Sequence, residues 1–292
     1  MIENYLKAFK AYDIRWIYGK EIDKKFTYIL GTAIWNYILE KFGWNSKFLI
    51  WCDVRNQNTE IIDNFVSWIK WTWFDNIFFA KFGNFDENKY PYWICSTSAL
   101  YYLWQWSFDL WVSITASHNP WEYVWFKFFD KEVELIMTDE LKDLFQKYYF
   151  DWEYFENILE RHVELVDEVQ SKKDSLFKFL LKKWEWIQKK YKFVVDFSTW
   201  AGTTIEHDFF EQIKDKHEIN YINNFPDWLF SSHESDTTTK WNYEQLSQKV
   251  RERSADFWIM FDWDVDRIWF VTNSWEVVNC DIITAIIANQ VL

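Results

Sequence analysis

Three acidic side chains alternate along one short stretch of the chain, FDWDVDR. In an extended loop, Asp262, Asp264 and Asp266 can turn three carboxylate oxygens toward one point, and such hard oxygen ligands are what Mg²⁺ and Ca²⁺ prefer. An EF-hand is excluded, because its sixth position requires Gly and its twelfth Glu, where this chain has Arg267 and Asn273. A divalent metal site is therefore predicted, with a phospho-aspartate site and a solvated acidic turn as alternatives.

A hydroxyl side chain stands in a second loop, ITASHNP. Ser117 follows an expected strand, has His118 and Asn119 beside it, and is followed by the turn residue Pro120. No aspartate partner completes a hydrolase triad, so His118 is weakly supported as a general base and an ordinary surface turn stays open. Beside a metal site, however, a serine that carries phosphate is chemically sensible, because a divalent ion offsets the charge on a phosphoryl group in transfer. Ser117 could then also be a metal ligand.

Four cations of the chain are candidate ligands for phosphate oxygens. Lys127 follows Ser117 in the same region and offers a point charge, whereas Arg15, Arg55 and Arg267 offer forked donors. Each of them taken alone is more often an ordinary surface cation.

The overall charge limits the class of partner. The 292 residues include 45 acids and 32 bases, for a net charge of -13, which disfavours nucleic acid and anionic membranes as partners because both require a basic surface. Cys52, Cys95 and Cys280 are isolated and odd in number, so they give no disulfide framework and favour a reducing compartment, by default the cytoplasm. No stretch reaches the ~18 apolar residues of a membrane span.

The loops described above follow elements that alternate between strand and helix. Because ligands of open α/β sheets bind beyond the carboxyl ends of strands, CDVR at 52–55 joins the other two loops as a candidate site segment. The alternation predicts a mostly parallel sheet with helices packed on it. The expected elements are helix 26–42 (ending at Gly43), strand 47–53, helix 59–71, strand 76–82, helix 98–106, strand 111–115, strand 191–197, helix 203–216, strand 218–222, helix 242–254 and strand 256–262.

These elements divide into two α/β domains. The first is expected over 1–135, a connecting segment over 136–155, and the second domain over 156–275. Segment 139–190 is rich in Lys and Glu with no Gly or Pro, which predicts helices with solvated faces. A helix with a strong apolar face is expected over 280–292, and because such a face normally docks on a sheet, 276–292 is expected to begin a third domain.

The chain has 23 Trp and 5 Gly, although Gly usually makes up about 7% of a protein. An alternating fold needs turns with positive φ, which Gly adopts without steric penalty. Trp121, Trp200, Trp263 and Trp275 stand where a turn glycine would be natural and are not expected in the core. We therefore hypothesise UGA codons that the source organism decodes as Gly and the applied translation decodes as Trp. A sugar-stacking surface, as in a carbohydrate-binding module, is the alternative.

Four stretches of the chain resemble the α-D-phosphohexomutases, in their phosphomannomutase/phosphoglucomutase branch. They are FKAYDIRWIYGKEID (9–23), ITASHNPWEYVWFK (114–127), VVDFSTWAGTT (194–204) and FDWDVDRIWFVTNSWEVVNCD (261–281). Their order and spacing agree with the family over most of the chain, and AYDIR favours this branch over the phosphoglucosamine mutases. The family has Gly at the positions of six tryptophans, which supports the decoding hypothesis: Trp16, Trp111, Trp125, Trp200, Trp263 and Trp269.

The resemblance implies consecutive three-layer α/β/α domains with mixed, mostly parallel sheets, and it implies site roles. Ser117 would be the phosphoserine that donates phosphate to a hexose phosphate and recovers it. Ser117 and the three aspartates of the 262–266 segment would hold Mg²⁺, with Arg267 completing the loop. Arg15, His118 and Lys127 fall on active-site positions of the family, with the last two as candidates for proton transfer.

The implied reaction interconverts the 6-phosphate and 1-phosphate of mannose or glucose through a hexose 1,6-bisphosphate. Small hexose phosphates are then the partners, and the oligomeric state stays open. Family members have four domains, the third reading the sugar hydroxyls and the fourth binding the substrate phosphate. The 292-residue chain is accordingly expected to hold a half-site with little or no turnover.

The chain also departs from the family pattern, at Val54 and Val124 and in the loop that contains Ser231, Ser232 and Glu234. Two other classes of function stay open. One is a non-catalytic sugar-phosphate-binding or scaffold protein that keeps the fold, and the other is a metal-dependent phosphatase with Asp262 as its nucleophile.

Overall fold

The computed structural model describes residues 2–53, 55–67, 77–79, 96–104, 107–150, 164–165, 169–185, 187–227, 254–278 and 280–291. They form two compact units. Unit 1 holds most of the described chain up to residue 169, and unit 2 holds the described residues from 170 onward together with the short pieces 96–99 and 117–119. No helix within these ranges is long and apolar enough to cross a membrane.

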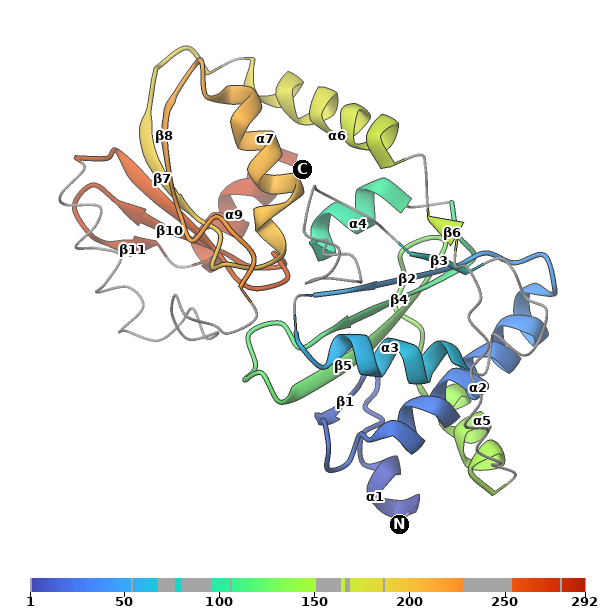
Figure 1. Ribbon diagram of the computed structural model, residues 1–292. Helices are drawn as coiled ribbons and strands as arrows, with labels where there is room; N and C mark the ends of the chain where they lie inside the picture. The colour runs from blue at the N-terminus through green and yellow to red at the C-terminus, as the bar shows by residue number, and fades with distance from the viewer. Residues whose placement is uncertain are drawn as a thin grey trace. The chain divides into compact units, whose positions relative to one another are not determined.

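Unit 1 is built on a mixed sheet of order β1-β5-β4-β2-β3-β6 (Figure 1). Strands β4, β2, β3 and β6 run parallel, whereas β5 is antiparallel to both β4 and β1. The strands are β1 Ile14–Ile17, β2 Phe48–Cys52, β3 Ile77–Phe79, β4 Leu110–Thr115, β5 Tyr123–Asp130 and β6 Glu164–Leu165. The helices are α1 Ile2–Leu6, α2 Lys24–Phe42, α3 Asn58–Ser67, α4 Thr97–Trp104 and α5 Asp139–Phe150.

Helices cover both faces of this sheet. One face buries alternate residues of β2 and β4 against α2, α3 and α5, in a core that includes Phe26, Phe65 and Phe145. On the other face, Tyr101 of α4 lies edge-on against Trp111 and Phe129. Because each strand sends successive side chains to opposite faces, both sets are buried and the unit has three layers.

Helix α2 shows how local sequence sets the limits of an element. The Asp23 carboxylate accepts a hydrogen bond from the backbone N of Phe26 at 2.8 Å and caps the start of the helix. Gly43 ends it at φ +82, as predicted, a conformation that Gly adopts without strain. Gly31 lets α2 and α3 approach closely, because a Cβ there would lie 2.0 Å from the carbonyl oxygen of Phe65.

Unit 2 has a second mixed sheet of order β11-β10-β9-β7-β8. Strands β9, β7 and β8 are parallel, and β10 is antiparallel to its two neighbours. The elements are α6 Val169–Trp184, β7 Lys192–Asp196, the 3-10 helix η2 Ala201–Thr203, α7 Ile205–Ile213, β8 Glu218–Ile222, β9 Phe257–Phe261, β10 Ile268–Thr272, β11 Val277–Val278 and α9 Cys280–Val291. Phe210 of α7 packs against Phe193 and Phe261 on one face of this sheet.

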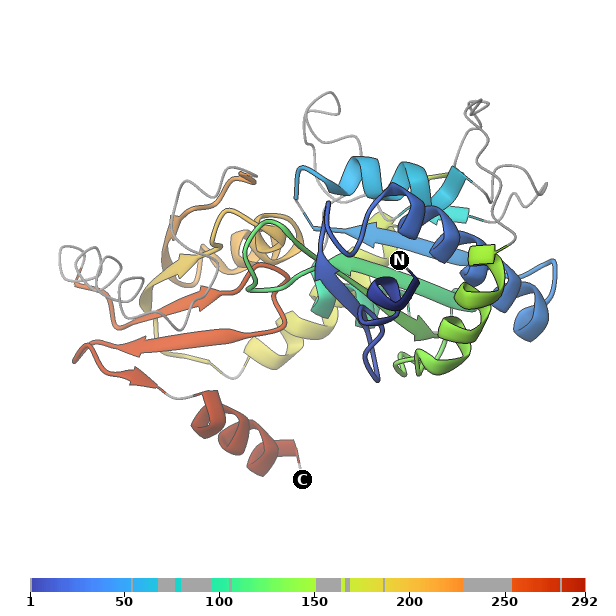
Figure 2. The same ribbon diagram turned by 90° about the horizontal axis from the view of Figure 1, so that it is seen from below.

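The predicted fold class is confirmed, and the predicted elements that fall on described residues form at or near their expected limits. One expectation was wrong, because strand β6 at Glu164–Leu165 lies in segment 139–190, where helices were predicted. The antiparallel strands β1, β5, β10 and β11 were not predicted either. The helix predicted at 242–254, apart from its last residue, the loop of residues 231–234 and residue 54 lie outside the described residues. The helix expected at 280–292 forms as α9 (Figure 2), and its Ile282, Ile286 and Ile287 are exposed.

The turn tryptophans differ from expectation in one respect. Only Trp275, at φ +71, takes the left-handed conformation among Trp121, Trp200, Trp263 and Trp275. Within two residues of Trp200 and Trp263, the left-handed backbone conformation occurs at Ser198, Thr199 and Val265 instead. The expectation that Trp200 and Trp263 lie outside the core was wrong, because both are fully buried.

The structure bears on the two explanations of the tryptophan excess. The largest fully buried side chains include six tryptophans, so within the described ranges most of the indole surface is not displayed for sugar stacking: Trp35, Trp51, Trp111, Trp200, Trp258 and Trp263. The indole N–H groups of Trp51 and Trp258 are buried with no hydrogen-bond partner among the described residues. Such an orphaned donor costs about 1–3 kcal/mol, a cost that glycine at these positions would not incur.

We predict UGA codons in the gene at positions 200, 263 and 275, and glycine there in the protein isolated from its source. At residue 275 the left-handed φ favours glycine by about 1–2 kcal/mol over a residue with a Cβ. Sequencing of the gene and peptide mass spectrometry of the native protein measure this directly. UGG codons at these three positions would end the hypothesis.

Candidate active site

The acidic loop is the six-residue connection between β9 and β10 in unit 2. The ladder that pairs Phe261 with Ile268 ends at this loop, and the backbone N of Asp262 donates to the carbonyl of Arg267 at 3.2 Å. The backbone N of Arg267 in turn donates to Oδ1 of Asp262 at 3.0 Å. A tight closure of the hairpin therefore orients the first carboxylate.

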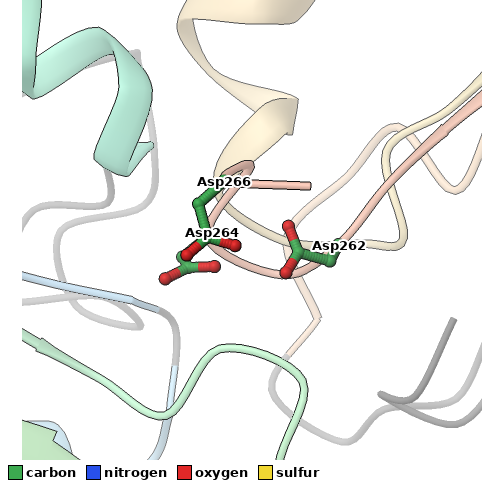
Figure 3. Close-up of side chains that lie close together, drawn as sticks. All are labelled: Asp262, Asp264 and Asp266. Carbon is green, nitrogen blue, oxygen red and sulfur yellow. The ribbon is translucent and has the colours of Figure 1, made fainter. Parts of the chain in front are cut away.

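The three carboxylates of this loop converge (Figure 3). Asp262, Asp264 and Asp266 each present an oxygen within 4.8 Å of the others. The first two are fully buried and the third is exposed. Arg267 is partly exposed, with Nε 3.8 Å from Oδ1 of Asp266.

Ser117 lies against the same loop, within unit 2. Its Oγ donates to Oδ2 of Asp262 at 3.1 Å, and Nδ1 of His118 lies 3.3 Å from Oγ. Ser117 is 1% exposed and has φ +46, an uncommon conformation for a residue with a Cβ. A left-handed backbone at such a place often marks a functional loop.

The carboxylate cluster affects the protonation of its first member, Asp262. Burial, followed by the negative charges of Asp264 and Asp266, raises the pKa of Asp262 well above its usual range. A divalent cation would offset this repulsion, and hard oxygen donors of this kind suit Mg²⁺ or Ca²⁺. The residues present therefore fit such a cation.

The sequence analysis missed a second contact to this loop, from the start of α4. The backbone N of Thr97 donates to the carbonyl of Asp264 at 2.8 Å, and its Oγ1 donates to Oδ2 of Asp264 at 3.3 Å. No local sequence motif predicts this contact, because 167 residues separate the two partners.

Glu206, at the start of α7, was also missed. It accepts a short hydrogen bond from the hydroxyl of Ser96, which also caps α4 by accepting from the backbone N of Ala99. The residue is half-buried overall, but its Oε2 is inaccessible and has no hydrogen-bond partner among the described residues. Burial raises the pKa of Glu206 to about 7, against the opposing effect of the Ser96 hydrogen bond.

Two predicted site cations belong to unit 1, where they flank one aromatic ring. Arg15 pairs with Trp125 across strands β1 and β5, and Lys127 lies two residues further along β5. The guanidinium of Arg15 is 5.0 Å and the ammonium of Lys127 is 5.5 Å from the Trp125 ring centre. Arg15 also forms an ion pair with Asp13 at 3.3 Å. The structure thus brings these two cations together on one face of the sheet.

Arg55, the remaining candidate phosphate ligand, is buried in unit 1. Its Nε pairs with Oδ2 of Asp53 at 3.0 Å, and both side chains are 0% exposed. Its Nη1 donates to the carbonyls of Pro120 and Tyr123. An inaccessible guanidinium already bound to three acceptors is poorly suited to a substrate phosphate, so the candidate role proposed for Arg55 is not favoured.

One indole ring of the acidic loop stacks on an indole ring from the segment that follows β7. Trp200 and Trp263 stack with ring centres 3.9 Å apart and planes 4° from parallel. The backbone N of Ala201 donates to the carbonyl of Trp263 at 3.2 Å and joins the two segments. Such a face-to-face arrangement is less favourable than the offset or edge-on contacts that aromatic pairs prefer.

Comparison with known sequences agrees with this geometry. The family model described as "Phosphoglucomutase/phosphomannomutase, alpha/beta/alpha domain I" matches residues 6–151. The phosphomannomutase of Methanocaldococcus jannaschii is 34% identical over 290 residues, which are 98% of this chain and 59% of that protein. The phosphoglucosamine mutase of Caldicellulosiruptor bescii is 26% identical, over 97% of this chain and 60% of that protein. The chain thus spans about 60% of the length of these curated relatives.

Solved structures share the fold. A phosphoglucomutase/phosphomannomutase family protein from Burkholderia thailandensis superposes with a TM-score of 0.75 at 20% identity, over 98% of this chain and 59% of that one. A putative phosphomannomutase from Thermus thermophilus gives 0.72 at 17% identity, over 93% and 58%. At these identities the likeness shows a common architecture.

Asp264→Asn is predicted to weaken Mg²⁺ binding by at least about tenfold, because it removes one anionic oxygen ligand from the cluster. Isothermal titration calorimetry with MgCl₂ measures the affinity. Asp256→Asn is the matched control, since the Asp256 carboxylate accepts a hydrogen bond from the backbone N of Lys192 in the same unit and lies outside the cluster. Equal affinities in the two variants would contradict a metal site here.

Glu206 is predicted to lower stability as pH rises between 4.5 and about 7. The folded state holds this proton more tightly than the unfolded chain, so the free energy of unfolding falls across that window, by roughly 3 kcal/mol at most. Glu206→Gln should flatten the slope in urea unfolding.

Glu211→Gln on the same helix is the control for this measurement. The Lys214 hydrogen bond lowers the pKa of Glu211, so its effect on stability is lost only below about pH 4.5, outside the window. If the free energy of unfolding of Glu206→Gln depended on pH as it does in the parent protein, the raised pKa of Glu206 would be contradicted.

Proposed function

Because the chain belongs to the α-D-phosphohexomutase superfamily, we propose that it works as a phosphohexomutase on mannose or glucose phosphates, with Ser117 as the phosphate carrier. The observation that carries this proposal is the 3.1 Å contact between the Ser117 hydroxyl and a carboxylate of the three-aspartate loop. A hydroxyl fixed beside a cation-binding cluster is what reversible phosphoryl transfer requires.

The reaction balances as two transfers. In the first, the bond between phosphorus and Oγ of phospho-Ser117 breaks, a bond forms from phosphorus to a free sugar hydroxyl, and that hydroxyl loses its proton to a base. The product is a hexose 1,6-bisphosphate. In the second, the other phosphoryl group passes to Oγ of Ser117, and a proton returns to the released sugar oxygen. The enzyme ends as it began.

A divalent cation bound by Ser117 and the three aspartates would neutralise charge on the phosphoryl group. Asp262 and Asp264 are buried and contribute ligands that are held in place by hydrogen bonds. Asp266 is exposed and completes the set. Mg²⁺ suits this donor set, because it prefers carboxylate oxygens together with substrate phosphates.

His118 and Lys127 are the proposed proton carriers. Nδ1 of His118 lies 3.3 Å from Oγ of Ser117, so His118 can hold a proton at that oxygen when the serine carries no phosphate. Lys127 and Arg15, which flank the Trp125 ring, offer two cations to phosphate or hydroxyl oxygens. Small hexose phosphates are the proposed partners.

Incubation of the full-length protein with glucose 1,6-bisphosphate and Mg²⁺ is predicted to place one phosphate on Ser117, detected by peptide mass spectrometry. Ser117→Ala should abolish the modification and reduce turnover by at least about 10³-fold, because the phosphate carrier is lost.

Ser113→Ala is the control, since Ser113 is a buried serine of the preceding strand, and it should behave like the parent protein. An unmodified Ser117 in a protein that binds the bisphosphate would favour the non-catalytic alternative. Phosphate on Asp262 instead would favour a phosphatase.

A further inference from the structure

Asp53 and Arg55 form a buried ion pair that the proposed reaction does not use. The Asp53 carboxylate accepts from four donors: the backbone N of Arg55 at 3.2 Å, Nε of Arg55 at 3.0 Å, Nδ2 of Asn58 at 2.8 Å and Oγ1 of Thr115 at 2.8 Å. Both charged side chains are inaccessible. The pair is thus fixed in one geometry.

This pair contacts the residues that flank the 116–119 segment on either side, and all of these flanking residues belong to unit 1. Thr115, just before the loop, donates its hydroxyl to Asp53, and the backbone N of Asp53 donates to the carbonyl of Ile114 at 3.1 Å. Just after the loop, Nη1 of Arg55 donates to the carbonyls of Pro120 at 2.8 Å and Tyr123 at 3.3 Å. One ion pair therefore holds the two ends of a four-residue segment, 116–119.

We propose that Asp53 and Arg55 are positioning residues that clamp both ends of the 116–119 segment and so fix the conformation from which Ser117 presents its hydroxyl. This inference rests on the proposed role of Ser117. The clamp explains how a non-glycine residue is held at φ +46, since the surrounding structure must over-determine a left-handed backbone.

Arginine is the residue type that this geometry requires. Its planar fork directs Nε to a carboxylate and a terminal nitrogen to two carbonyls at the same time, whereas a lysine ammonium is a single point donor on a flexible stem. A buried ion pair is also a poor source of net stability compared with apolar packing. A role in fixing the loop accounts for its presence better than a role in holding the fold together.

Arg55→Lys in the full-length protein tests the clamp. The charge remains, but the fork is lost, so amide hydrogen exchange at residues 116–119 should rise by at least about tenfold while the amides of β2 and β4 keep their protection. Turnover of glucose 1-phosphate should show kcat lower by about 100-fold with little change in KM, as expected for a misplaced reacting group. Thr115→Val, which removes one hydrogen bond at similar size, should change both quantities in the same direction by less.

Asp109→Ala is the matched control. Its carboxylate accepts from the backbone N of Lys47 at 2.9 Å, at the opposite end of β2 and β4, so its loss weakens unit 1 without touching the clamp. Exchange at 116–119 that is no faster in Arg55→Lys and Thr115→Val than in Asp109→Ala would overturn the proposal, as would an equal loss of kcat in all three. Hydrogen exchange needs no turnover. A parent protein that never phosphorylates Ser117 would thus refute the proposed function, while the exchange data would still decide on the clamp.

Discussion

Repulsion between like charges in the β9–β10 loop is the constraint on which the site depends. Asp262 and Asp264 are buried within 4.8 Å of each other and of Asp266, although desolvation and the neighbouring negative charges both penalise the ionised form of Asp262. Hydrogen bonds from Ser117, Arg267 and Thr97 fix the carboxylates but cannot remove that charge. A divalent cation can, and the same positive charge suits a phosphoryl group on the serine. The cluster that costs stability is thus the part on which the proposed chemistry depends.

The sheets of both units place their polar loops by the same rule. Each chemically loaded loop follows the carboxyl end of a buried strand: CDVR follows β2, the serine loop follows β4, and the acidic loop follows β9. Parallel neighbours β2 and β4 end side by side, so Asp53 can accept the hydroxyl of Thr115 across 62 residues of sequence. The contacts that orient the reacting groups are therefore consequences of sheet topology.

Sequence patterns predicted the parallel strands other than β6, together with their helices, because these are dense apolar runs with clear boundaries, such as Phe48–Cys52. The antiparallel strands escaped, since β1 has four residues with only its first fully buried and β5 is an aromatic run without strict alternation. The three aspartates were found because their spacing is local. Thr97, Ser96 and Glu206 were not, because tertiary packing brings each of them to its partner from more than a hundred residues away. Arg55 was predicted as a phosphate ligand, but the sequence pattern did not indicate that its side chain is buried.

The tryptophans connect the decoding hypothesis to the chemistry. Trp263 of the acidic loop stacks on Trp200, and the Trp125 ring lies beside both Arg15 and Lys127. The hydrogen bond from the backbone N of Ala201 to the carbonyl of Trp263 requires the two backbone segments to lie close together. With glycine at 200 and 263, this close approach would not require two stacked rings. With glycine at 125, the two cations would face an open surface that a phosphate could enter. Decoding UGA as glycine would therefore remove the buried indole groups at 200 and 263 and would also open the cation pair beside residue 125 to the proposed anionic substrate. One decoding rule would account both for the composition and for an accessible site.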